Sequence, residues 1–229
     1  MDNFNVYKDI QARTKGEIYI GVVGPVRTGK STFIKRFMEL AVLPAMEDES
    51  LKAVSTDELP QSAGGKTVMT TEPKFIPKEA VQITLGDGIQ AKVRLIDCVG
   101  YMVDGAAGHV ENGEERMVKT PWSEKEIPFT QAAQIGTRKV IGDHSTIGIV
   151  VTTDGSVGEL KRSAYIDAEK QTVDELKKLG KPFILLLNST KPYSDETLKL
   201  AEQLAAGKRP GNGKKTRTSE SDDTDPQKK

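Results

Sequence analysis

Eight residues near the start of the chain have the composition and spacing of a phosphate-binding loop. Gly24–Ser31 has the sequence GPVRTGKS, which matches the pattern G-x-x-x-x-G-K-[ST]. Glycines let the backbone curl around a phosphate group, whose charge then meets several N–H groups and the positive end of a helix. We expect the Lys30 ammonium to reach the β- and γ-phosphates and the Ser31 hydroxyl to ligate Mg²⁺.

This pattern is specific only where it joins a buried strand to a helix, and the flanking sequence predicts both. Residues 18–24 form a β-branched run typical of a strand buried on both faces. From Lys30 the apolar spacing becomes helical, and the predicted face consists of Phe33, Phe37, Leu40 and Ala41, with Ile34 and Met38 beside it. Arg27 either contacts phosphate or faces solvent as a spacer. The residues expected to hold the nucleotide are Gly24, Pro25, Val26, Arg27, Thr28, Gly29, Lys30, Ser31 and Thr32.

A second candidate site lies at the end of the apolar run LIDCVG, residues 95–100. A carboxylate at the end of a buried strand is placed to hold the hydration shell of Mg²⁺, which is the Walker-B role expected for Asp97. The spacing Asp97-x-x-Gly100 also resembles the DxxG motif of GTPase-like proteins, in which the glycine amide senses the γ-phosphate. Asp97 is therefore a candidate metal ligand and Gly100 a candidate catalytic residue.

Two adjacent threonines lie between these motifs, in the segment GKTVMTTEP at residues 65–73. Switch-type NTPases place a threonine in such a loop, where it reaches Mg²⁺ and the γ-phosphate once the loop is ordered. The spacing does not choose between Thr70 and Thr71, and local turn bonds are the alternative role for both. Both are candidate catalytic residues, and Thr70 is a candidate metal ligand together with Ser31 and Asp97.

The segment after the apolar run 183–187 argues against guanine recognition. GTPases carry Asn-Lys-x-Asp at this place, and the carboxylate accepts both donors of the guanine edge. Here Asn188 is present, but Ser189 replaces the lysine and Lys191 replaces the aspartate. A site without that acceptor leaves the guanine donors unpaired, which costs selectivity by orders of magnitude. The sequence therefore favours ATP, with Asn188 as a further nucleotide-binding residue.

The elements that must position these residues alternate between strand and helix. A hairpin is predicted from 81–85 and 93–97, whereas 44–80 and 99–128 show no regular pattern and are predicted to be loops. Helices are predicted over about 129–142, about 160–180 and after Ser194, with strands at 146–151 and 183–187. This alternation predicts an α/β fold with a mainly parallel sheet.

Composition limits the class of protein. Thirty-three Lys and Arg balance 33 Asp and Glu, so a nucleic-acid partner is not expected from global charge. One cysteine excludes a disulfide framework, and neither a signal peptide nor a membrane-spanning run is recognised, so a cytoplasmic protein is expected. Residues 207–229 contain no Val, Ile, Leu, Met or aromatic residue and are predicted to be a disordered polar tail.

The motifs GPVRTGKST, GGKTVMTTEP, LIDCVGYMVDGA, IVVTTDGS and LLLNSTKP together resemble the stage IV sporulation protein A family. The resemblance implies a P-loop NTPase fold like that of the TRAFAC GTPases, with hydrolysis of ATP in place of GTP. It also implies that hydrolysis is coupled to self-polymerisation into the basement layer of the spore coat, on the mother-cell side of the forespore surface. By the same resemblance Lys30 is the Walker-A lysine, Asp97 the Walker-B carboxylate, and Thr70 or Thr71 the nucleotide-sensing threonine.

The resemblance covers residues 1–206, the expected ATPase domain, and family members continue into further domains. The chain is therefore expected to be truncated and to assemble poorly. Partners implied by the resemblance are other copies of the chain, spore-coat proteins and a small membrane-bound amphipathic peptide. The alternative function is a nucleotide-binding switch or scaffold that either does not hydrolyse nucleotide or responds to GTP.

Overall fold

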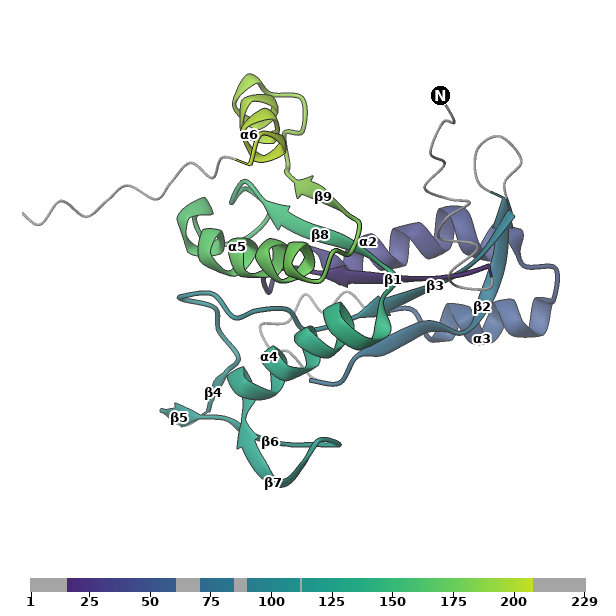
Figure 1. Ribbon diagram of the computed structural model, residues 1–229, viewed down its shortest axis with the longest axis horizontal. Helices are drawn as coiled ribbons and strands as arrows, with labels where there is room; N and C mark the ends of the chain where they lie inside the picture. Colours follow the sequence, from purple (N-terminus) through teal and green to yellow (C-terminus); the bar gives the residue numbers. More distant parts are fainter. Residues whose placement is uncertain (1–15, 61–70, 85–89, 112, 208–229) are drawn as a thin grey trace, which may run out of the picture.

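A five-stranded sheet with helices on both faces forms the centre of the computed structural model, which describes residues 16–60, 71–84, 90–111 and 113–207 (Figure 1). The strand order is β2-β3-β1-β8-β9, in which β3, β1, β8 and β9 are parallel and β2 runs antiparallel to β3. The strands are β1 (Glu17–Val23), β2 (Lys74–Thr84), β3 (Gln90–Asp97), β8 (Ile147–Thr153) and β9 (Phe183–Asn188). The predicted P-loop NTPase fold with a mainly parallel sheet is confirmed, as is the hairpin, whose turn lies outside the described residues.

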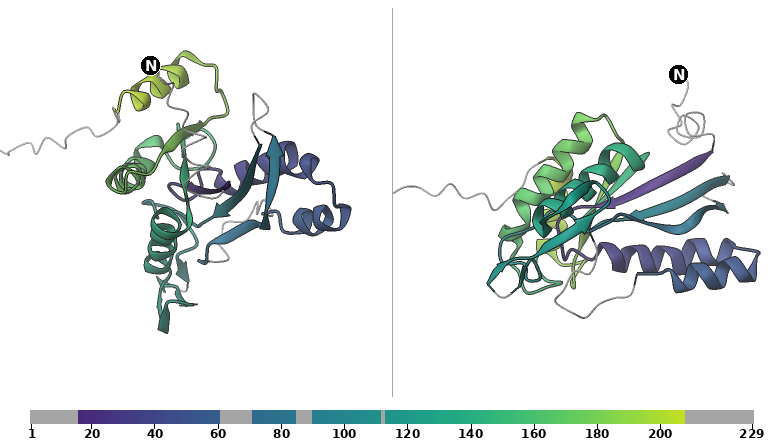
Figure 2. Two further views of the ribbon diagram at one scale, coloured as in Figure 1. Left: turned by 45° about the vertical axis from the view of Figure 1, so that its right-hand side comes forward. Right: turned by 90° about the horizontal axis from the view of Figure 1, so that it is seen from below.

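The helices lie in two layers (Figure 2). One layer holds α2 (Lys30–Phe37), its continuations η1 (Met38–Val42) and η2 (Leu43–Ala45), and α3 (Glu49–Asp57). The opposite face of the sheet is covered by α4 (Phe129–Lys139), its continuation η4 (Val140–His144), and α5 (Arg162–Lys178). The last helix, α6 (Asp195–Ala205), follows the edge strand β9, and the Ser194 side chain caps it by accepting a hydrogen bond from the Thr197 amide. The predicted helices in the second half of the chain are thus confirmed.

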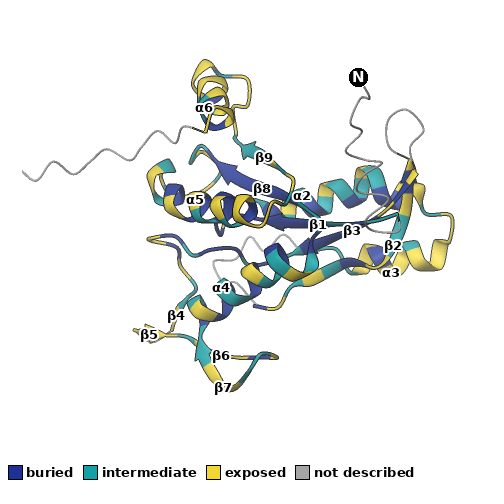
Figure 3. Ribbon diagram, in the orientation of Figure 1, coloured by how far each residue is buried: buried dark blue, intermediate teal, exposed yellow. Residues whose placement is uncertain are grey.

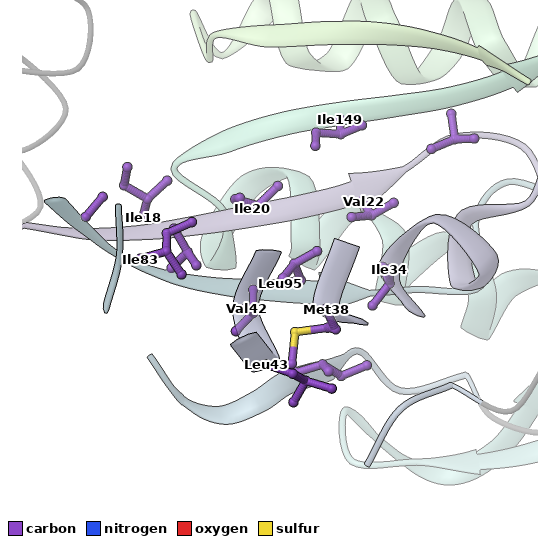
Figure 4. Close-up of a cluster of buried hydrophobic side chains, with 14 residues drawn as sticks. Ile18, Ile20, Val22, Ile34, Met38, Val42, Leu43, Ile83, Leu95 and Ile149 are labelled. Atoms are coloured by element: carbon purple, nitrogen blue, oxygen red, sulfur yellow. The ribbon is translucent and has the colours of Figure 1, made fainter. Parts of the chain in front are cut away.

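Alternation along β1 divides the core between the two layers. Ile18, Ile20 and Val22 point to the α2 side and pack against Ile34 and Met38 (Figure 4). The opposite side of the sheet packs against η4 and α5, through a cluster that includes Val23, Val150, Ile141, Tyr165 and Leu176. Each fully buried Val, Leu, Ile or Met side chain in these clusters contributes about 1.5–3 kcal/mol of transfer free energy. Buried residues accordingly concentrate along the central strands (Figure 3).

The predicted apolar face of the first helix is only partly correct, because Phe33 and Phe37 pack against the core but Leu40 does not. The buried stripe is Ile34, Met38 and Val42, whereas Leu40 is 76% exposed and Phe33 and Phe37 are only partly buried. The stripe begins at Lys30, which is itself buried in the phosphate-binding loop. The loop therefore fixes the rotation of the helix about its axis, which apolar spacing alone leaves open between two adjacent faces.

Two regions predicted to be loops contain regular structure. Residues 44–80 contain α3 and the first half of β2. Asp48 caps α3 by accepting hydrogen bonds from the Ser50 and Leu51 amides, but the helix buries only Ser55 and so shows no apolar stripe in the sequence. Residues 99–128 contain two short hairpins, formed by β4 (Val110–Glu111) with β5 (Glu114–Glu115) and by β6 (Met117–Thr120) with β7 (Ser123–Pro128).

The chain ends lie mostly outside the described part of the structure. Residues 208–229 are not described, so the division into a domain over 1–206 and a polar tail over 207–229 stays a prediction. Among the described helices, none has both the length and the apolar character that a membrane crossing requires.

Candidate nucleotide-binding site

The loop Gly24–Gly29 connects the carboxyl end of β1 to the first residue of α2. Three positive φ angles bend it, at Gly24 (127°), Arg27 (60°) and Gly29 (94°). The Thr28 hydroxyl donates to the Pro25 carbonyl at 3.0 Å and closes the bend from inside. Val26 is buried in the core, so it contributes to a nucleotide site only through its backbone, and Arg27 reaches the Ala107 carbonyl at 3.2 Å.

Lys30 lies inside this loop. Its side chain is almost completely buried, and its Nζ donates to the Pro25 carbonyl at 2.6 Å and to the Gly24 carbonyl at 3.4 Å. Burial lowers the pKa of the ammonium, and the nearby Cys98 and Asp97 oppose that shift. The hydrogen bonds of this desolvated cation within the described residues go to neutral carbonyls. It is therefore placed to exchange them for the charged oxygens of a phosphate, with which it makes stronger hydrogen bonds.

Ser31 and Asp97 meet at the same edge of the sheet. The Ser31 hydroxyl donates to Asp97 Oδ2 at 2.9 Å, while Asp97 Oδ1 is buried without a hydrogen-bond partner in the described part of the chain. Burial raises the pKa of Asp97, although the Ser31 hydrogen bond and the Lys30 charge lower it in part. A hydroxyl beside a carboxylate oxygen that still lacks a partner fits Mg²⁺, which binds oxygen ligands and is usually held by one or two carboxylates plus substrate phosphates.

Gly100 lies against the phosphate-binding loop. A Cβ at this position would be 2.2 Å from the Gly24 carbonyl oxygen and 2.6 Å from Lys30 Nζ, and the φ of Gly100 is +95°. Backbone hydrogen bonds join the two segments, from the Val26 amide to the Tyr101 carbonyl at 2.9 Å and from the Tyr101 amide to the Gly24 carbonyl at 3.2 Å. Only glycine fits here, and its position beside the lysine is the one expected for a γ-phosphate sensor.

Comparison with known proteins agrees with these motifs. The family model for "Stage IV sporulation protein A, ATPase domain" matches residues 1–209. The chain belongs to the stage IV sporulation protein A family. The family resemblance expected from the motifs is thereby confirmed, and residues 1–209 correspond to a nucleotide hydrolase domain.

Named relatives extend well beyond this domain. Stage IV sporulation protein A of Bacillus subtilis (strain 168) is 56% identical over 205 residues, which are 90% of this chain and 42% of that protein. The protein of the same name from Clostridioides difficile (strain 630) is 55% identical over 202 residues, 88% of this chain and 41% of the relative. The chain therefore spans about two fifths of the length of these curated relatives.

Two solved structures align over most of the chain. A variant of SsGBP covers 86% of this chain and 46% of its own, and a dimerisation-deficient variant of Toc33 from Arabidopsis thaliana covers 89% and 69%. Both alignments have 15% sequence identity and a TM-score of 0.40.

In this member of the stage IV sporulation protein A family, Asn188 supports the phosphate-binding loop. Its side-chain amide donates to the Thr28 carbonyl at 3.0 Å, and a Cβ on Gly29 would lie 2.4 Å from that same nitrogen. Asn188, which the sequence assigned to nucleotide binding, thus binds the backbone of the loop through its side-chain amide. Asn188 reaches the loop because β9 ends at the same edge of the sheet as β1.

The polar side chains that follow β8 and β9 form hydrogen bonds mainly with one another. Asp154 accepts from the Ser156 amide and hydroxyl at 2.9 and 2.6 Å and from the Thr197 hydroxyl at 3.3 Å. Burial alone would raise the pKa of Asp154, but hydrogen bonds from Ser156, Ser189 and Thr197 lower it below its usual value. Ser189 accepts from the Lys191 amide at 2.9 Å. The one carboxylate in this network is therefore already engaged by local donors.

Of the two candidate sensing threonines, Thr70 and Thr71, the structure describes only Thr71. Thr70 lies outside the described residues. Thr71 is buried, and its carbonyl lies against α4, where a Cβ on Gly136 would be 2.6 Å from the oxygen. Thr32, also assigned to nucleotide binding from the sequence, is exposed on α2. The other assigned residues gather around the loop.

Thr137 is a site neighbour that sequence reasoning missed. Its hydroxyl accepts from the Gly100 amide at 3.2 Å and donates to the Ala133 carbonyl at 2.8 Å. The predicted helix over 129–142 placed Thr137 correctly in a helix, but no motif marks it. Its role depends on how α4 packs against the sheet.

Proposed function

We propose that this domain binds Mg-ATP at the Gly24–Ser31 loop and hydrolyses its β–γ phosphoanhydride bond. The observation that best supports this proposal is the hydrogen bond from the Ser31 hydroxyl to Asp97 Oδ2, 2.9 Å long, beside the buried Lys30. Together these residues offer a cation for the phosphates and two oxygen ligands for a metal. The family model, which describes an ATPase domain, supports the same assignment.

Each residue of the site has a proposed role that follows from its position. Lys30 would exchange the Pro25 carbonyl for oxygens of the β- and γ-phosphates, and the amides of the loop would hold the remaining charge. Bound Mg²⁺, held by Ser31 and Asp97, would neutralise charge that develops on the transferred phosphoryl group. The Gly100 amide and a threonine at 70 or 71 would then contact the γ-phosphate as it leaves.

ATP is the proposed nucleotide because the guanine-reading carboxylate is replaced by Lys191. The carboxylate of the polar network described above, Asp154, accepts hydrogen bonds from Ser156 and Thr197. Competition between ATP and GTP for the chain tests this proposal, with the double variant Ser189→Lys, Lys191→Asp as comparison. We expect ATP to bind at least as tightly as GTP, and the double variant to shift the ratio toward GTP by about tenfold or more. A clear preference of the parent chain for GTP would contradict the proposal.

Hydrolysis is further proposed to drive self-assembly of the basement layer of the spore coat on the forespore surface, within the mother-cell cytoplasm. Other copies of the chain, spore-coat proteins and a small membrane-bound amphipathic peptide are the proposed partners. Support for these proposals comes from membership of the family rather than from the geometry of the site.

Light scattering and electron microscopy of the purified chain, with and without Mg-ATP, test the coupling. We expect any ordered particles to require Mg-ATP and to be lost in Lys30→Ala. Particles that form equally well without nucleotide would contradict it. ATP binding without turnover would instead favour the alternative, a nucleotide-binding switch that does not hydrolyse.

A further inference from the structure

Helix α4 contacts the nucleotide-sensing segments through two consecutive buried residues, Gly136 and Thr137. The Thr137 hydroxyl accepts the hydrogen bond of the Gly100 amide at 3.2 Å while donating to Ala133 of its own helix at 2.8 Å. Gly100 in turn lies beside Lys30, since a Cβ there would be 2.6 Å from Nζ. One hydroxyl therefore connects α4 to the segment that faces the phosphates.

Gly136 makes the second contact. A Cβ on Gly136 would be 2.6 Å from the carbonyl oxygen of Thr71, a backbone atom, and 3.7 Å from the ring of Trp122. Glycine within a helix is less stable than alanine, so its presence here is explained by the close approach of Thr71. Two consecutive residues of α4 thus contact both segments, Gly136 by packing against Thr71 and Thr137 by a hydrogen bond to Gly100.

The other end of α4 carries the β6–β7 hairpin, which lies away from the sheet (Figure 1). The strand β7 runs directly into the helix at Phe129, whose amide donates to the Arg116 carbonyl at 2.8 Å. The guanidinium of Arg116 lies over the Phe129 ring, 4.2 Å from its centre. Movement of α4 would therefore carry the hairpin with it.

We propose that Gly136 and Thr137 are positioning residues that hold Thr71 and Gly100 in the resting state, so that a γ-phosphate must compete with α4 for them. This proposal rests on the proposed binding of ATP at the Gly24–Ser31 loop. The Gly100 amide has a single hydrogen, which serves either the Thr137 hydroxyl or a phosphate oxygen. A charged acceptor forms the stronger hydrogen bond, so a triphosphate favours release from Thr137 whereas a diphosphate does not. Both sensing segments then report the γ-phosphate to α4 and to the hairpin.

Calorimetry with Mg²⁺ and either a non-hydrolysable ATP analogue or ADP tests the Thr137 contact. Thr137→Val removes the resting acceptor and should raise the ratio of triphosphate to diphosphate affinity by about fivefold, the worth of one neutral hydrogen bond. Thr137→Ser retains the hydroxyl and should restore the parent ratio. An unchanged ratio in a folded Thr137→Val variant would overturn the proposal while leaving ATP binding intact. Failure of the parent chain to bind either nucleotide would overturn the proposed function and this inference with it.

The variant Gly136→Ala tests the contact with Thr71 independently of Thr137 and has a matched control. The added methyl group must displace Thr71 in the parent arrangement, so turnover of ATP should fall about tenfold or more while ADP affinity stays unchanged. Gly142→Ala is the control, because a Cβ at Gly142 has no atom within 4 Å. Trp122 is the only tryptophan of the chain and lies beside Gly136, so its emission should change with the ATP analogue but not with ADP. Equal turnover in Gly136→Ala and Gly142→Ala, or identical emission with both nucleotides, would contradict the proposed link.

Discussion

The Ser31 hydroxyl lies 2.9 Å from the Asp97 carboxylate although 66 positions separate the two residues in the chain. The sheet brings them together, because β1 and β3 are parallel and Val22 pairs with Asp97. Helix α2 begins at the same edge after one short loop, so its first turn faces the end of β3. The proximity of Ser31 and Asp97, the proposed metal-binding pair, is therefore a consequence of strand order, and it depends on the register of β1 against β3.

Asp97→Asn should uncouple stability from activity. Burial raises the pKa of Asp97 in the folded state, so the folded protein holds the proton more tightly than the unfolded chain. The stability contributed by the protonated carboxyl is lost as pH rises through that pKa. At neutral pH the ionised, buried carboxylate therefore lowers stability. Asparagine removes the charge, so the melting temperature without nucleotide should stay equal or rise. Turnover should fall by about a hundredfold or more, as when one group that stabilises transition-state charge is removed. Asp104→Asn, at an exposed carboxylate, is the control; a lower melting temperature for Asp97→Asn alone would contradict this explanation.

The two sensing threonines should affect turnover more than binding. In the proposed mechanism the loop amides and Lys30 would hold the nucleotide in the ground state, whereas a switch threonine would act mainly where charge develops on the γ-phosphate. The double variant Thr70→Ala, Thr71→Ala should therefore hydrolyse ATP more slowly with little change in ATP affinity, measured by steady-state kinetics and calorimetry. Single variants decide which of the two contributes. Parent-like turnover in the double variant would remove both residues from the mechanism.

Asn188→Ala should weaken nucleotide binding indirectly. The variant removes the donor that holds the Thr28 carbonyl, and one lost hydrogen bond of this kind costs about 1 kcal/mol, or about fivefold in affinity. The effect should be similar for ATP and GTP, because Asn188 acts on the loop rather than on the base. Thr190→Ala, at an exposed neighbouring position, serves as control. A loss confined to one nucleotide would show that Asn188 reads the base instead.

How far the sequence predicts this site depends on whether a residue belongs to a local motif. Lys30, Ser31 and Asp97 lie in short patterns that adjoin buried strands, and the structure brings all three together. Thr137 lies within an unremarkable helix, and its contact with Gly100 follows from packing across 37 positions. The error at Leu40 in the first helix has a similar cause, since Leu40 and Ile34 are both apolar and the buried Lys30 decides which of them faces the core.

Cys98 should resist alkylation in the folded protein. Burial raises the pKa of its thiol to about 11, despite the nearby Lys30 charge. The thiolate is the reactive form, and a thiol with this pKa is only roughly 0.1% ionised at pH about 8. Iodoacetamide labelling should therefore be slow until the pH nears that pKa or the protein unfolds. Cys98 is the only cysteine, so labelling in denaturant provides the full signal; rapid labelling of the native chain would show that the thiol is accessible.

Turnover of ATP by the 229-residue chain, in the presence and absence of Mg²⁺, shows whether Lys30 serves an Mg-dependent ATPase when the parent is compared with Lys30→Ala. Lys35→Ala is the matched control, because Lys35 lies on the same helix but is partly exposed and only 3.9 Å from Glu39 in a surface ion pair. We expect Mg-dependent release of phosphate from ATP by the parent and by Lys35→Ala, and almost none by Lys30→Ala. Equal phosphate release by Lys30→Ala and the parent would contradict this expectation.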